Sequence, residues 1–214
     1  MVGRDKELNR IELQVMKAIN GEGSIVNIIG EAGIGKSRLV AELKNREMMK
    51  QIYLFEGRAI STGRNLSFHP IIDLLKQWVR IGEDDSGEVA IKKLEIAIRR
   101  ITPEEINEVL PFVATLMGMK LSGGYKERIK GIEGEALEKL ILKNMRDLII
   151  NATELKPHVI VMEDLHWADT SSLELLVSLF RLVETQNIVF INVLRPGYEE
   201  TGDRIVETIK ERFP

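Results

Sequence analysis

The fold is decided by residues 30–37, which read Gly30-Glu31-Ala32-Gly33-Ile34-Gly35-Lys36-Ser37. They match the spacing G-x-x-x-x-G-K-[ST] and lie between an apolar, β-branched stretch at 24–29 and a helical pattern that begins near Lys36. Glycines let the backbone curl so that successive N–H groups face phosphate oxygens, and the start of the helix adds its positive dipole end. The stretch therefore predicts a phosphate-binding loop, with an exposed Lys36 on the β and γ phosphates and Ser37 on a magnesium ion.

A glycine-rich turn with a solvated lysine is the alternative, and a second motif argues against it. The apolar run at 159–162 is followed by Glu163 and Asp164. A phosphate loop needs a carboxylate at a nearby strand end to hold magnesium and its water, and often a second one to polarise the attacking water. An acidic pair after a strand is usually a solvated turn, so this interpretation depends on the phosphate loop.

Strand-like and helix-like stretches alternate along the chain. Strands are predicted at 24–29, 52–55, 159–162 and 188–194. Helices are predicted at 5–19, from Lys36 through Leu43, at about 171–184 and at 204–212. This alternation predicts a parallel sheet covered by helices on both faces, an α/β fold of the P-loop NTPase three-layer type.

About a hundred residues between the second and third strands have helical spacing almost throughout, which predicts a helical insertion. A helix start is predicted at 102–105 from a threonine, a proline and a glutamate at capping positions. The glycine-rich segment 118–134 is predicted to be a mobile loop, and a capping box is predicted at 171–174. We expect all 214 residues to form a single domain.

Composition narrows the function classes. The net charge of -3 gives no overall positive field for nucleic acid, and cysteine is absent, which removes disulfides and thiolate metal sites. The first ten residues are charged rather than apolar, and no apolar run approaches the length of a bilayer span. A soluble, cytoplasmic protein without a membrane or nucleic-acid partner is expected.

Three stretches together resemble a family. They are the phosphate loop continued through Arg38-Leu39-Val40, the later Glu163-Asp164-Leu165-His166-Trp167-Ala168-Asp169, and the opening Val2-Gly3-Arg4-Asp5-Lys6-Glu7-Leu8. In this order they are similar to the STAND class of AAA+-related signalling ATPases, and within it to the ATPase modules of adenylyl or guanylyl cyclases and of large signalling regulators. The resemblance covers nearly the whole chain. It implies ATP and Mg²⁺ as ligands and effector domains attached in a larger parent protein.

The resemblance also assigns roles to individual residues. It makes Glu163 the acid beside magnesium and Asp164 the candidate for activating water, although many relatives carry two aspartates and the division of labour stays open. Arg195 stands where the family senses the γ-phosphate, with a solvated loop arginine as the alternative. Val2, Gly3 and Arg4 match the segment that lies against adenine and ribose.

Other polar residues near the motifs have simpler interpretations. Trp167 beside His166 is expected to be packed rather than catalytic, and Asp169 is expected to cap a helix. A further set follows the second strand and is expected to be solvated: Arg58, Arg64 and His69.

Relatives fold a sheet with strand order 5-1-4-3-2, whereas four strand candidates are present here. We therefore expect a fragment in which strand 24–29 lies at an open edge and can self-associate, with weak turnover. The leading functional hypothesis is a switch driven by ATP binding and hydrolysis. The alternatives are a nucleotide-holding scaffold, a small-molecule phosphotransferase and a DNA-associated ATPase; the acidic balance argues against the last.

Overall fold

The computed structural model describes residues 4–63 and 66–213. The described chain divides into two compact units. The first contains the residues up to Leu74 together with those from Lys156 onward, and the second runs from Leu75 to Leu155.

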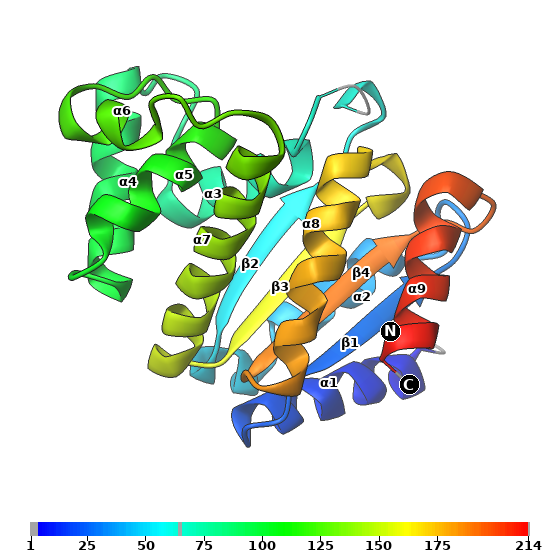
Figure 1. Cartoon of the computed structure of the whole chain (residues 1–214). Coiled ribbons are helices and arrows are strands. Elements are labelled where there is room, and N and C mark those ends of the chain that lie inside the picture. Colours follow the sequence, from blue (N-terminus) through cyan, green and yellow to red (C-terminus); the bar gives the residue numbers. More distant parts are fainter. Residues whose placement is uncertain (1–3, 64–65, 214) are drawn as a thin grey trace. The chain divides into compact units, whose positions relative to one another are not determined.

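A four-stranded sheet forms the centre of the first unit (Figure 1). Its strands are β1 (Ser24–Ile29), β2 (Tyr53–Arg58), β3 (His158–Glu163) and β4 (Ile188–Leu194). All three pairings are parallel and the order is β1-β4-β3-β2, which confirms the predicted α/β fold with a parallel sheet. Among the described residues β1 pairs with β4 alone, so its outer edge is open, as predicted.

Burial along the strands follows from their place in the sheet. Every residue of β4 is buried, and so are the first five residues of β3, because these central strands are covered on both faces and need continuous apolar runs. β1 is only partly buried, as expected of an edge strand. Strand β2 extends to Arg58, three residues beyond the prediction, and this brings Arg58 into register with Glu163.

Helices cover both faces of this sheet. α1 (Asp5–Ile19) and α2 (Lys36–Lys44) contribute their buried residues to one apolar core with alternate residues of the strands. On the other face, which is the nearer one in Figure 1, lie α8 (Thr170–Phe180) and α9 (Arg204–Arg212). There the ring of Phe180 meets that of Phe190 edge to face, with centroids 5.0 Å apart.

The start of α8 is fixed by Asp169. Its carboxylate accepts hydrogen bonds from the backbone N–H of Ser172 at 2.9 Å and from that of Phe68 at 3.1 Å. The cap expected at Asp169 is therefore present, and it satisfies one of the free N–H groups of the first turn. The capping box predicted at 171–174 is wrong, because those residues already lie inside the helix.

The second unit is helical. Its helices are α4 (Gly87–Ile101), α5 (Ile106–Leu116), α6 (Gly123–Ile129) and α7 (Gly134–Leu155), preceded by the end of α3 (His69–Val79). The insertion is thus confirmed as helical, but the loop predicted at 118–134 contains α6, and the helix predicted from 102–105 begins only at Ile106. Within the described ranges, no helix is both long and apolar enough to cross a membrane.

A buried histidine makes the stability of the first unit dependent on pH. His158 opens β3 with its Nδ1 2.6 Å from the backbone oxygen of Lys156, and its ring contacts those of Tyr53 and Phe55. Since a carbonyl oxygen only accepts, Nδ1 carries the proton of the neutral ring. Burial lowers the pKa of His158 from 6.5 to about 4.

We expect this histidine to destabilise the fold in acid. Between pH 6.5 and 4 the unfolded chain binds a proton that the folded chain does not, so stability falls as the pH falls through this window. The expected loss between pH 7 and pH 5 is about 2 kcal/mol, measured by urea unfolding at the two pH values. His158→Asn keeps an N–H donor for Lys156 and does not titrate, so its loss should be smaller by about that amount. An equal loss in the two proteins would contradict this role.

Candidate functional site

The phosphate loop follows β1 and includes the first two residues of α2. Gly33 and Gly35 have φ angles of 76° and 90°, in the left-handed region that favours glycine. Gly35 is the N-cap of α2, so the free N–H groups of the first helical turn face the loop. The glycine spacing read from the sequence thus corresponds to a backbone that other residues would adopt only with strain.

Lys36 is folded back over this loop. Its Nζ donates to the backbone oxygens of Gly30 at 2.6 Å and Glu31 at 2.9 Å. The residue is 8% exposed, so the expectation of an exposed lysine is wrong. The ammonium group is held inside the loop by weak partners, two neutral carbonyls, which an anion can replace.

The charges around Lys36 show which groups converge on it. Burial is the main reason that the pKa of Lys36 lies below its ordinary value, and the positive charges of Arg195 and Arg4 lower it further. The negative charges of Asp164 and Glu31 act in the opposite direction. Lys36 is therefore within electrostatic reach of residues that follow β3 and β4, as the parallel order β1-β4-β3 requires.

Arg195 directly follows β4, beside the start of the phosphate loop. The last residues of the two strands are in register, Ile29 with Leu194, and the N–H of Gly30 donates to the oxygen of Leu194 at 3.3 Å. The Nε of Arg195 is buried and has no hydrogen-bond partner among the described residues. A buried donor without a partner costs about 1–3 kcal/mol, and an anionic ligand is one kind of partner that would satisfy it, although the residue as a whole is only half-buried.

The two acids at the end of β3 are held by an arginine from β2. Glu163 is the last residue of β3, and Asp164 follows it with a φ of 52°. The Nη2 of Arg58 lies 3.3 Å from Oε2 of Glu163, and its Nε lies 3.3 Å from Oδ2 of Asp164. The backbone N–H of Arg58 donates to Oδ2 of Asp73 at 2.9 Å. One guanidinium therefore bridges Glu163, the candidate magnesium ligand, and Asp164, the candidate for activating water.

Sequence reasoning missed the role of Arg58. The expected strand order already placed the second strand beside the third, but ending that strand at residue 55 left Arg58 in a loop. In the structure Arg58 is in register with Glu163. Extending the strand to Arg58 would have predicted the contact, whereas no sequence signal identified Asp73.

The remaining sequence candidates are distributed around the site. Ser37 and Arg38 are exposed in the first turn of α2, and Arg38 lies 3.9 Å from Glu42. Arg4 precedes α1 and His69 begins α3, while Val2, Gly3 and Arg64 lie outside the described residues.

His166 and Trp167 are packed rather than exposed as a catalytic pair. His166 is fully buried, and its ring centroid lies 4.6 Å from that of Tyr198 and 5.0 Å from that of Trp167. Trp167 is half-buried, and its ring centroid lies 5.1 Å from that of Tyr198.

The site combines three features of a parallel sheet: a glycine-rich loop after an edge strand, a buried lysine in that loop, and an acidic pair two strands away. Together they define a P-loop nucleotide-binding domain. The family model described as "AAA ATPase domain" matches residues 1–191, and the chain belongs to this family. Nucleotide binding and ATPase activity are the properties that this membership indicates.

One relative is similar to nearly the whole chain. An uncharacterized protein of Rhizobium meliloti (strain 1021) is 27% identical over 199 residues, which is 92% of this chain. The match covers 19% of that protein, so the chain spans about a fifth of the relative's length.

Proposed function

We propose that the chain is an ATP-driven switch of the STAND type, which binds ATP with Mg²⁺, hydrolyses it slowly and signals through effector domains attached to it. The observation that carries the proposal is the position of Lys36, buried in the loop on two neutral carbonyls and in electrostatic reach of Arg195 and Asp164. A group so placed can exchange its partners when phosphate arrives, and such an exchange changes the loop.

The residues present fit magnesium and ATP. Ser37 and Glu163 supply the oxygen ligands that Mg²⁺ prefers, and the ion would neutralise phosphate charge and polarise the terminal phosphorus. Lys36 would transfer its hydrogen bonds from the loop carbonyls to phosphate oxygens. Arg195 would donate to the γ-phosphate, and Asp164 would accept a hydrogen bond from the attacking water and orient it.

The proposal is tested first by ligand binding and turnover. Calorimetric titration with ATP, ADP and GTP, each with and without Mg²⁺, is expected to show binding of ATP and ADP, with magnesium strengthening ATP. Phosphate release should be slow but above that of the Lys36→Met variant. Hydrogen exchange compared between the ADP and the slowly hydrolysed ATPγS states should differ around residues 30–37 and 163–169. Absence of nucleotide binding in the wild-type chain refutes the proposal.

A nucleotide-holding scaffold is the second candidate, and the contacts of Arg58 favour it. A guanidinium that stays on both acids would oppose magnesium and leave water without its base. In that case ATP would bind while phosphate release equalled the uncatalysed rate. Turnover that depends on Asp164 rejects the scaffold.

Arg58→Ala is expected to raise the apparent affinity for Mg²⁺ in the presence of ATP by about three- to tenfold. The substitution removes a positive charge 3.3 Å from each acid, and exposed ion pairs of this kind contribute about 0.2–1 kcal/mol each. The measurement is a Mg²⁺ titration followed by the fluorescence of a labelled ATP. Lys44→Ala, which removes a positive charge that pairs with Glu56 rather than with Glu163 or Asp164, should leave the titration unchanged. A weaker Mg²⁺ affinity in Arg58→Ala would show that the arginine supports the ion rather than competing with it.

A further inference from the structure

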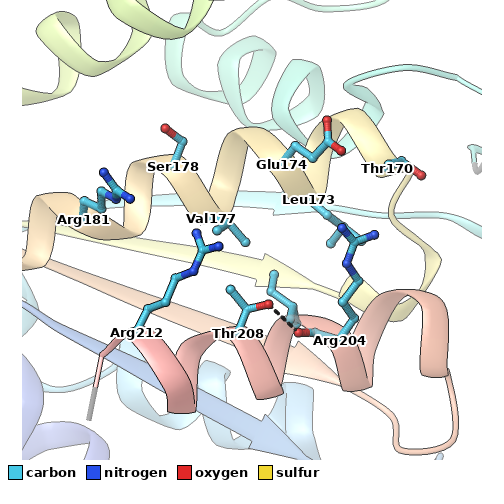
Figure 2. Close-up of a pocket in the computed structure, with 10 residues that line it drawn as sticks. Thr170, Leu173, Glu174, Val177, Ser178, Arg181, Arg204, Thr208 and Arg212 are labelled. Atoms are coloured by element: carbon cyan, nitrogen blue, oxygen red, sulfur yellow. Dashed lines mark hydrogen bonds between the residues drawn. The ribbon is translucent and has the colours of Figure 1, made fainter.

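A groove of about 380 Å³ runs between the outer faces of α8 and α9 (Figure 2). Its lining residues all belong to these two helices and to Arg181, which directly follows α8. None of them belongs to the phosphate loop, to the acidic pair or to the arginines described above. The groove thus shares no residue with the proposed nucleotide site.

The groove carries excess positive charge. Arg181, Arg204 and Arg212 line it, and Glu174 is the one acid among the lining residues. Within the described part of the chain none of these three arginines has a carboxylate within 4.0 Å, so their charges are open to an outside ligand. Three arginines against one glutamate give the groove a net charge of +2, opposite in sign to the net charge of -3 of the whole chain.

The charges are arranged along the groove with apolar residues between them. Arg204, Thr208 and Arg212 are spaced by four residues and form one row on α9, about 12 Å long. Figure 2 shows Arg181 and Arg212 together toward one end, and Arg204 with Glu174 toward the other. Val177 is half-buried between these ends, over the buried Leu173 and Ile205, so the groove has a small apolar floor that is exposed mainly at Val177.

We propose that this groove docks an acidic amphipathic helix of a partner protein. The apolar side of such a helix would cover Val177 and its neighbours, and its carboxylates would meet the uncompensated end at Arg181 and Arg212. A phosphate polymer has no apolar face to place on Val177, so it would leave that part of the floor uncovered, whereas an amphipathic helix would cover it. The charge and the apolar floor together therefore favour a peptide over a nucleic acid.

The probe is a fluorescein-labelled peptide of about 18 residues, long enough to form a helix, with leucines on one face and glutamates beside them. A matched peptide carries lysine at each glutamate position. Fluorescence anisotropy should show that the glutamate peptide binds at least about tenfold more tightly than the lysine peptide, and that its affinity falls as salt is raised from 0.1 M to 0.5 M.

Variants locate the binding. Arg181→Glu/Arg212→Glu should weaken the glutamate peptide about tenfold or more and strengthen the lysine peptide. Arg10→Glu/Arg146→Glu changes the net charge equally at exposed positions outside the groove and should leave both affinities within about twofold. Thermal melts establish that each variant folds.

Val177→Asn tests the apolar floor without changing charge, and it should weaken the glutamate peptide as well. No binding of the glutamate peptide, equal binding of the two peptides, or full affinity in the Arg181→Glu/Arg212→Glu variant would overturn the proposal. A DNA duplex that binds more tightly than the peptide and is indifferent to Val177→Asn would assign the groove to nucleic acid instead.

Discussion

Replacement of Lys36 by methionine is expected to weaken ATP binding about 100-fold or more. The ammonium group would supply at least two charge-assisted hydrogen bonds to phosphate oxygens, and bonds to charged groups contribute about 1.5–3 kcal/mol each. A loss of about 3 kcal/mol corresponds to a factor of about 100 in the dissociation constant. Calorimetric titration of ATP into the wild-type and variant proteins measures this ratio.

Methionine is preferred to alanine because Lys36 is buried. The chain of the lysine fills space within the loop, and methionine keeps most of that volume. The two carbonyls that lose their donor lie in a solvent-facing loop, where water can replace it, so the loss of folding stability should stay near 1 kcal/mol. Lys6→Met, at an exposed position of α1, is the matched control and should bind ATP as the wild type does. Similar ATP affinity in the Lys36 and Lys6 variants would remove the lysine from the site.

The parts of the fold that the sequence predicted well are those in which local pattern and burial agree. β1, the start of α2, β4 and α9 were predicted with the bounds that the structure has. In β4 all seven residues are buried, so the largely apolar run predicts both the strand and its central position in the sheet. The phosphate loop was predictable because the positive φ angles at these two positions favour glycine, and Gly33 and Gly35 occupy them.

The wrong boundaries are those set by tertiary contacts. Glu56, Gly57 and Arg58 carry little strand propensity, yet they pair with β3 as far as Glu163. Similarly α6 forms in a glycine-rich segment, where Arg128 makes an ion pair with Glu108 at 2.6 Å and stacks over the ring of Phe112 on α5. Partners distant in sequence decide such elements, so a local pattern cannot predict them.

The same distinction applies to the site. Lys36, Glu163 and Asp164 were found because they belong to motifs with fixed spacing. The bridging position of Arg58 depends on which strand lies beside β3 and on its register, and the buried Nε of Arg195 depends on packing at the end of β4. These two interactions depend on contacts between distant residues, so only the folded structure reveals them.

The roles of the two acids can be separated by a pair of amide substitutions. Asp164→Asn is expected to lower kcat by about 100- to 1,000-fold, the usual contribution of a base that orients and activates water, while the affinity for ATP changes less than about threefold. Asparagine tolerates the left-handed conformation that Asp164 adopts at φ 52°, so the substitution removes the charge without straining the backbone. Single-turnover phosphate release, together with calorimetry, measures both quantities.

Glu163→Gln is expected to affect binding of Mg²⁺ with ATP more than the activation of water. Glu163 ends β3 with its side chain largely buried, so its loss should weaken binding of Mg²⁺ with ATP by about tenfold and leave magnesium-free ATP binding nearly unchanged. Excess Mg²⁺ should then restore much of the turnover of Glu163→Gln and none of that of Asp164→Asn.

If excess magnesium rescues Asp164→Asn instead, the two roles are exchanged. If neither substitution slows phosphate release, water is activated elsewhere, and the acids serve only the contact with Arg58. Glu56→Gln, which changes an acid on β2 that pairs with Lys44, controls for the loss of negative charge near the sheet and should leave both binding and turnover intact.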